Sequence, residues 1–155
     1  MPIECGSREM SGSLTEKFIW PVRVYYEDTD AGGVVYHANY LRFMARARNE
    51  WLRAMGHPVE QIAAGESKLF LVRRVEIEFR KPARLSDDLQ VSAEVVDIRK
   101  ASMQLRQEVR RGDDENGELL VSALVELAMV NAESFRPVRL AGFLLEPPLS
   151  ESVEN

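Results

Sequence analysis

The spacing of hydrophobic residues predicts one long helix in the first third of the chain. Between residues 38 and 55 the apolar residues recur at the spacing of a single helix face, as Leu41, Met44, Ala45, Trp51, Leu52 and Met55. Gly56 follows and ends the helix. Arg48 lies within this stripe, where we expect it to snorkel from the helix edge or to pair with an acid.

Alternation of apolar and polar residues predicts strands on both sides of that helix. Before it, Val22, Val24 and Tyr26 share one face, and the strand stops at Asp28-Thr29-Asp30. After it, the inward positions are Val75, Ile77 and Phe79, then Leu89, Val91, Ala93 and Val95, then Met103, Leu105 and Val109, and finally Leu119, Val121, Ala123, Val125, Leu127 and Met129. These segments predict an α+β fold, an antiparallel sheet with one face covered by the helix.

The stretch from Tyr25 to Tyr40, YYEDTDAGGVVYHANY, joins the first strand to the helix and carries the candidate chemistry. Asp30 comes just before Gly32 and Gly33, two residues that allow positive φ or close approach of the backbone to a ligand. Unpaired amides at the start of a helix favour a carbonyl oxygen that becomes an oxyanion.

We expect those amides near Val35, Tyr36 and His37, beside the Asp30 carboxylate. Asp28 is the rival acid. The alternative is that Asp28, Thr29 and Asp30 only form a polar turn and a helix cap.

The string VRVYYEDTDAGGVVYHANYLRF resembles the opening motif of the YbgC-like acyl-CoA thioesterases, a branch of the hotdog-fold 4-hydroxybenzoyl-CoA thioesterase superfamily. The resemblance extends from about residue 20 to residue 140. It implies a hotdog fold, in which an antiparallel sheet wraps a long central helix. It also implies a homodimer or tetramer whose sites are built across the dimer interface.

Carried over by position, the resemblance makes Asp30 the essential acid and the N–H near His37 the group that polarises the thioester carbonyl. The His37 side chain is a further catalytic candidate, with a structural hydrogen-bonding role as its alternative. Tyr26 matches a site-lining position, and we add Gly33, Val35 and Tyr36 as candidate substrate-binding residues.

The chain departs from the family pattern at two positions. Many relatives have a glutamate on the central helix where this chain has Ala45, and many have an aspartate where it has Asn131. Ala45 removes one candidate acid and concentrates the expected chemistry on Asp30. The pattern gives no functional account of Asn131.

Length and composition predict a single domain over residues 18–141, with mobile ends at 1–17 and 142–155. The net charge of −5 argues against broad nucleic-acid binding. Three basic pairs offer cations that can bind CoA phosphates: Arg73-Arg74, Arg80-Lys81 and Arg99-Lys100. We interpret each of these residues first as part of a solvated strand edge. The single cysteine, Cys5, lacks the surroundings of a nucleophile.

We expect a cytoplasmic protein, because the sequence has neither a signal peptide nor an integral membrane segment. His37 and His57 have no metal-site spacing, and no GxSxG motif occurs, so we expect neither a metal nor a cofactor, coenzyme A being part of the substrate.

The expected reaction is hydrolysis of an acyl-CoA thioester, or of the equivalent acyl carrier protein thioester, to an acid and a thiol. Asp30 would act as nucleophile or as general base, and the sequence leaves both open. A second hypothesis is a non-catalytic binder of acyl carriers or of the Tol-Pal envelope system, with which the family is associated. A third is a hotdog hydroxyacyl dehydratase using His37 and Glu50.

Overall fold

A computed structural model describes residues 16–58, 60, 62, 67–114 and 116–140. The expected mobile ends, apart from residues 16 and 17, lie outside the described residues, as does Cys5. In chain order the elements are β1 (Phe18–Arg23), the 3-10 helix η1 (Tyr26–Asp28), α2 (His37–Ala54), β2 (Lys68–Phe79), β3 (Asp88–Ile98), β4 (Ser102–Arg111) and β5 (Glu118–Asn131).

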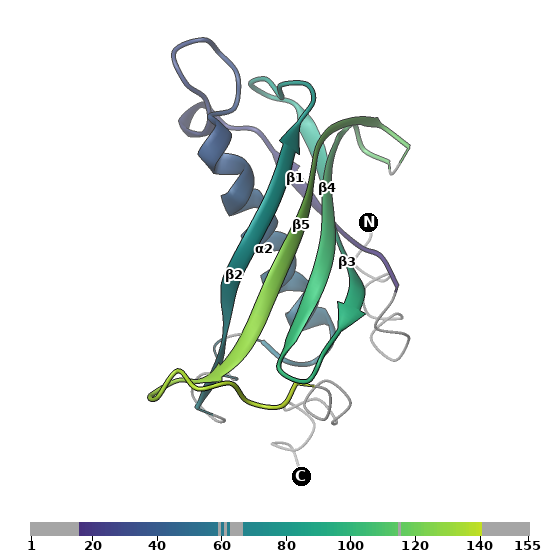
Figure 1. Cartoon of the computed structure of the whole chain (residues 1–155). Helices are drawn as coiled ribbons and strands as arrows, with labels where there is room; N and C mark the ends of the chain where they lie inside the picture. The colour runs from purple at the N-terminus through teal and green to yellow at the C-terminus, as the bar shows by residue number, and fades with distance from the viewer. Residues whose placement is uncertain (1–15, 59, 61, 63–66, 115, 141–155) are drawn as a thin grey trace.

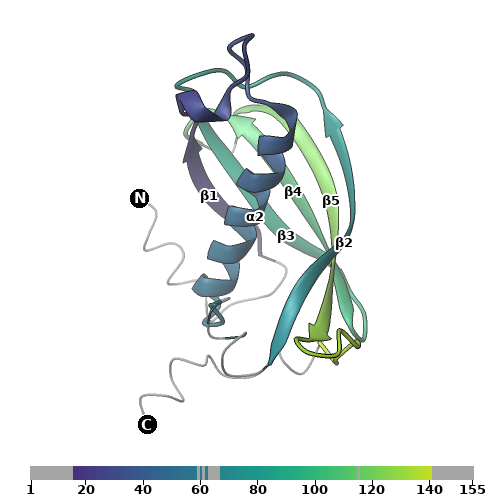
Figure 2. The same cartoon turned by 90° about the vertical axis from the view of Figure 1, so that its left-hand side faces the viewer.

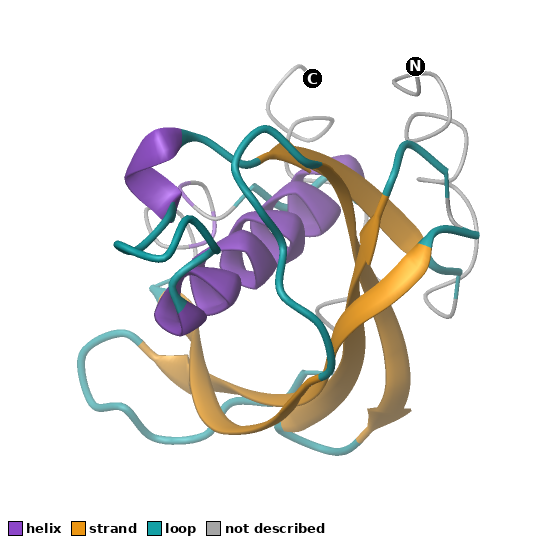
Figure 3. Cartoon of the chain, turned by 90° about the horizontal axis from the view of Figure 1, so that it is seen from above, coloured by secondary structure: helices purple, strands orange, loops and turns teal. Residues whose placement is uncertain are grey.

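The five strands form one antiparallel sheet in the order β1-β3-β4-β5-β2 (Figure 1). The helix α2 lies across one face of this sheet, with its closest approach to β3 and β1 (Figure 2). Seen from above, the sheet curves around the helix (Figure 3). The predicted antiparallel sheet with one covered face is therefore confirmed.

The core fills the space between α2 and the concave face of the sheet. The helix contributes Phe43, Met44, Ala47, Trp51 and Leu52, all at most 3% exposed. The strands contribute the alternate residues that the sequence pattern selected, including Leu89, Val91, Met103, Leu105, Val109, Val121 and Val125. The helix ends at Ala54, and Gly56, just after its C-cap Met55, has a φ of +90°, which confirms the predicted glycine stop.

Three predictions about local structure are wrong. The first strand ends at Arg23, and Tyr26 lies on η1, because the Asp28 carboxylate accepts the Tyr25 N–H at 2.9 Å and draws the chain into a turn. Leu41 is 44% exposed and does not belong to the buried helix face. Leu120 is fully buried in place of the predicted Leu119, which is only half-buried, because a bulge beside Val109 shifts the β4 and β5 register near its end.

A buried amide occupies the centre of the core beneath the helix. Gln107 is fully buried, and its Nε2 donates to the carbonyl oxygens of Met44 and Ser92, both at 3.1 Å. Its Oε1 accepts a hydrogen bond from Arg48 at 3.0 Å. Burial lowers the pKa of Arg48, which has no acidic partner among the described residues. Of the two roles expected for Arg48, pairing with an acid is thus wrong, because an amide takes the place of the acid.

Asn131, which departs from the family pattern, has a structural role at the end of β5. Its Oδ1 accepts the N–H groups of Glu133 and Ser134 at 2.9 and 3.0 Å and so forms the turn that follows the strand. Either an asparagine or an aspartate can supply this acceptor, because both carry an oxygen at the same place.

Candidate active site

The start of α2 presents two backbone donors that have no acceptor among the described residues. The N–H groups of Val35 and Tyr36 donate to the carbonyl oxygens of Ala83 and Asp28, at 2.9 and 3.0 Å. His37 and Ala38 are the first two helical residues, and within the described part of the chain their N–H groups have no acceptor. The donors expected near residues 35 to 37 are therefore those of residues 37 and 38.

Asp30 lies in a tight turn that ends next to this helix start. Its N–H donates to the Val34 carbonyl at 2.9 Å, its carbonyl accepts the Gly33 N–H at 3.0 Å, and Thr29 pairs with Val35 just outside the turn. The Asp30 side chain is exposed, and its Oδ1 accepts the Gly32 N–H at 2.8 Å. Oδ2 has no protein donor among the described residues, so one carboxylate oxygen is available to a substrate or to water.

The two glycines of this turn have different physical roles. Gly33 has a φ of +82°, a conformation that side chains with a Cβ rarely adopt. Gly32 holds its N–H against the Asp30 carboxylate, and a Cβ added there would lie 3.3 Å from Asp30 Oδ1. The positive φ predicted for these glycines therefore occurs at Gly33. Close approach of the backbone to a ligand stays a prediction.

Asp28 has a structural position, and this separates it from Asp30. It is 7% exposed, and its two carboxylate oxygens accept the Tyr25 N–H at 2.9 Å and the Asn39 Nδ2 at 3.0 Å. Its carbonyl oxygen also accepts the Tyr36 N–H. Asp28 thus ties η1 to the first turn of α2, which fixes the direction of the unpaired helix amides.

Three aromatic rings surround the helix start, and we call Tyr36, His37 and Phe79 the aromatic rim. The His37 ring lies 4.5 Å from the Tyr36 ring and 6.4 Å from the Phe79 ring, measured between centroids. Tyr36 and Phe79 are each 49% exposed, so about half of each side chain faces solvent beside the His37 ring.

Tyr40 is buried and packs against Phe79 of the aromatic rim. Its ring lies 5.7 Å from that of Phe79, and its hydroxyl oxygen accepts the Ala83 N–H at 3.0 Å. Burial raises the pKa of Tyr40, so the phenol stays neutral. The sequence pattern missed Tyr40 and treated Phe79 as core. The signal that could have found Phe79 is its position as the last strand residue before the Arg80-Lys81-Pro82 break.

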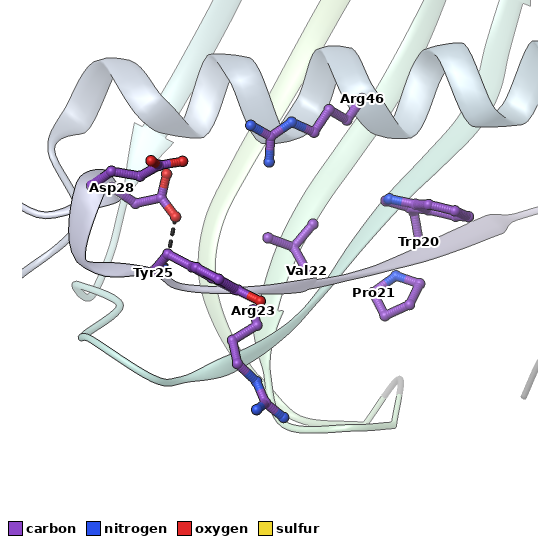
Figure 4. Close-up of a pocket in the computed structure, with 8 residues that line it drawn as sticks. Trp20, Pro21, Val22, Arg23, Tyr25, Asp28 and Arg46 are labelled. Atoms are coloured by element: carbon purple, nitrogen blue, oxygen red, sulfur yellow. Dashed lines mark hydrogen bonds between the residues drawn. The ribbon is translucent and has the colours of Figure 1, made fainter.

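Two other residues expected to line the site differ in exposure, and their role in binding substrate stays a prediction. Tyr26 is 82% exposed on η1, and Val35 is 4% exposed within the hydrophobic core. A cleft of about 280 Å³ opens between β1, η1 and α2, with Trp20, Val22, Asp28 and Arg46 among its lining residues (Figure 4). Asp30 does not line this cleft.

The basic pairs predicted at the strand edges are largely neutralised. Arg73, Arg74, Arg80, Lys81 and Arg99 each form an ion pair with a nearby surface acid. This arrangement fits the solvated-edge interpretation of these residues.

Within one chain, the two residues of the dehydratase hypothesis lie far apart. Glu50, the single carboxylate of α2, lies 13 residues after His37, which places it about 20 Å away along the helix axis. It also pairs with Arg53 at 3.6 Å. Within the described residues, no group of three or more potential ligands is placed to hold a metal ion.

Comparison with known proteins gives consistent matches. The family model described as thioesterase superfamily matches residues 32–118. The acyl-CoA thioester hydrolase YbgC of Escherichia coli O6:H1 is 43% identical over 118 residues, covering 74% of this chain and 87% of that protein. The acyl-CoA thioesterase YbgC of Haemophilus influenzae is 40% identical over 125 residues, covering 81% and 89%.

Among solved structures, one described as a probable thioesterase from Bartonella henselae superposes with a TM-score of 0.75 at 36% identity. The match covers 81% of this chain and 99% of that one.

Proposed function

This chain belongs to the thioesterase superfamily, as a YbgC-like protein with the hotdog fold, and from that premise we propose that Asp30 and the first amides of α2 form its active site. The protein is an acyl-CoA thioesterase, which hydrolyses the thioester to a free acid and a thiol. The roles of individual residues below are our proposal.

In the proposed reaction the thioester carbonyl oxygen accepts hydrogen bonds from the N–H groups of His37 and Ala38. These donors have no acceptor in the described part of the chain and lie at the positive end of the helix, so they stabilise the negative charge that develops on this oxygen. In the general-base route Asp30 takes a proton from water as the water attacks the carbonyl carbon. The tetrahedral intermediate then expels the CoA sulfur, which receives that proton.

In the nucleophilic route an Asp30 oxygen attacks the carbonyl carbon directly and CoA leaves as the thiolate. The resulting mixed anhydride is then hydrolysed by water, which regenerates the carboxylate. Both routes need one carboxylate oxygen without a protein partner, and among the described residues Asp30 Oδ2 meets this requirement. No role for the His37 imidazole is needed in either route, so its proposed catalytic role stays a prediction.

The observation that supports this proposal best is the contrast between Asp30 and Asp28. Two carboxylates lie two residues apart. Asp28 is buried with both oxygens bonded, whereas Asp30 is exposed, and one of its oxygens has no donor among the residues that the structure describes. A buried acceptor that is already satisfied stabilises the fold, while an accessible one can react. This division gives each acid a separate role.

The proposed function is tested by incubating the purified protein with acyl-CoAs of different chain length and measuring free thiol. Thiol release that scales with enzyme concentration is the expected result. The alternative is a non-catalytic binder of acyl carriers or of the Tol-Pal system, which would bind the same acyl-CoAs without releasing thiol. An acyl carrier protein thioester belongs in the panel as a second proposed substrate.

We also propose that the protein acts as a homodimer, or as a tetramer built from such dimers, through the edge strand β2. The two edges of the sheet differ: β1 contains Pro21, which hinders pairing, whereas β2 has no proline and exposes Leu71 and Val72 by 40% and 48%. The exposed position of Asp30 supports this proposal, because a second chain could supply the missing wall of the site.

The charges on β2 also fit self-pairing. If two copies pair antiparallel with Val75 opposite itself, Arg74 of one chain lies opposite Glu76 of the other. Within one chain these residues form an ion pair at 2.6 Å.

Replacing Val72 with aspartate is expected to weaken the dimer by about 10- to 100-fold in Kd, because a charge would be buried at the paired edge. Sedimentation velocity over a concentration series measures this change, and activity should fall with the dimer fraction. Leu41→Asp is the control, because Leu41 is similarly exposed but lies on α2. Unchanged association in Val72→Asp would place the interface elsewhere.

Among the described residues no helix is long and apolar enough to cross a membrane. We propose that the enzyme is located in the cytoplasm.

A further inference from the structure

Phe79 is the last residue of β2, and its side chain is half exposed at the rim of the sheet. It lies on the same strand face as Val75 and Ile77, which pack against the core. Its ring contacts two residues of α2, with its centroid 5.7 Å from Tyr40 at an angle of 56° and 6.4 Å from His37 at 87°. One part of the ring is thus held by the protein while the other part faces outward.

The Phe79 ring packs against the residue that carries one of the helix-start amides, so it can contact a thioester bound there. His37 carries one of those amides on its backbone, and its imidazole packs edge-on against Phe79. A thioester whose carbonyl oxygen reaches the amide would therefore have its substituents beside the aromatic rim. One substituent is the acyl group and the other is the pantetheine arm, so the chemistry of the rim must distinguish them.

Within this rim, the Phe79 ring suits the acyl group better than the pantetheine arm. The pantetheine arm carries two amides that need hydrogen-bond partners when they lose water, and the face of a phenylalanine ring supplies none. An apolar acyl group loses no hydrogen bonds there and gains burial and ring contact. Tyr40 packs against the Phe79 ring and holds it in place, so the surface offered to the acyl group is preformed.

We propose that Phe79 is a specificity-determining residue of the thioesterase site, forming the wall against which an apolar or aromatic acyl group packs. This inference rests on the proposed function and adds the substrate class to it. The enzyme then prefers acyl groups with an apolar body beyond the carbonyl, such as hexanoyl or benzoyl, over acetyl.

The test compares kcat/KM for acetyl-CoA, hexanoyl-CoA and benzoyl-CoA in the wild type and in Phe79 variants. Phe79→Ala is expected to lose about tenfold in kcat/KM with hexanoyl-CoA and benzoyl-CoA, and less than about twofold with acetyl-CoA. Phe79→Leu keeps apolar volume but removes the flat ring, so it should lower the ratio of benzoyl to hexanoyl activity. Phe79→Tyr should behave as the wild type.

Phe135→Ala is the matched control. Phe135 is 59% exposed and follows β5, whose last residue Asn131 pairs with Lys68 at the beginning of β2. Phe79 is at the other end of that 12-residue strand, about 35 Å away. This variant should leave all three kcat/KM values unchanged.

Two results would overturn the inference: an equal loss with all three substrates, or no loss with any of them. The first would mean that Phe79 only supports the fold or the dimer, and sedimentation at the assay concentration would show which. If Phe79→Ala does not fold, the benzoyl to hexanoyl ratio of Phe79→Leu decides. The proposed function fails separately, when the wild type releases no thiol or when Asp30 proves dispensable.

Discussion

Replacing Asp30 with asparagine is expected to lower kcat by about 10³-fold while leaving the fold and acyl-CoA binding intact. The amide oxygen of asparagine can still accept the Gly32 N–H, so the turn that Asp30 forms at 2.8 Å is preserved. The free carboxylate oxygen is lost, and with it the group that attacks the thioester or activates water. Steady-state thiol release gives kcat, and calorimetric titration with a non-hydrolysable acyl-CoA analogue gives the affinity.

Glu27→Gln is the matched control for this variant, because it removes a second exposed carboxylate from the same segment. Its turnover should equal that of the wild type. Turnover within about threefold of the wild type in Asp30→Asn would eliminate the proposed role of Asp30. A large loss of affinity would instead indicate that this acid mainly positions the substrate.

Isotope labelling separates the two routes that remain open for Asp30. After many turnovers in ¹⁸O-labelled water, attack of water on the side-chain carbon of a mixed anhydride would leave ¹⁸O in the Asp30 carboxylate. Mass spectrometry of the peptide containing Asp30 measures this label. Label in that peptide, and its absence from the peptide of an enzyme kept without substrate, would establish the nucleophilic route.

Replacing Asp28 with alanine is expected to lower the free energy of unfolding by about 2–4 kcal/mol, the largest effect on stability that the site region offers. The side chain is 7% exposed and accepts hydrogen bonds from the Tyr25 N–H and from Asn39 Nδ2. Its removal leaves two donors without partners, and hydrogen bonds to a charged group contribute about 1.5–3 kcal/mol each. Urea unfolding followed by circular dichroism measures the change.

The two aspartates should therefore show opposite profiles. Asp28→Ala loses stability, and its activity falls because η1 no longer anchors the first turn of α2, whereas Asp30→Asn loses activity at nearly constant stability. Thr29→Ala serves as a local control for Asp28, since its hydroxyl donates to the Tyr26 carbonyl at an exposed position. If Asp28→Ala is as stable as the wild type, the anchoring role assigned to Asp28 is wrong.

Where local patterns act alone, the sequence predicts the molecule well. The long helix, its glycine stop and the inward faces of β3 and β4 follow from spacing, because burial on one side repeats with the period of the element. The hydrophobic pattern fails where contacts with another segment or side chain decide which residue is buried or where a strand ends. Leu120 is buried because of a bulge in its pairing with β4, and Tyr26 leaves the strand because the Asp28 side chain bonds to the backbone.

By itself, the sequence determined the chemical groups of the candidate site: an acid, a pair of glycines and a helix start in one short stretch. Only the tertiary structure decided which groups are available. It shows that the Val35 and Tyr36 amides are already paired, that Asp28 is buried and satisfied, and that Phe79 reaches the helix start from a distant strand. Hydrogen bonding and burial depend on segments far apart in the chain, and a linear pattern carries no record of those contacts.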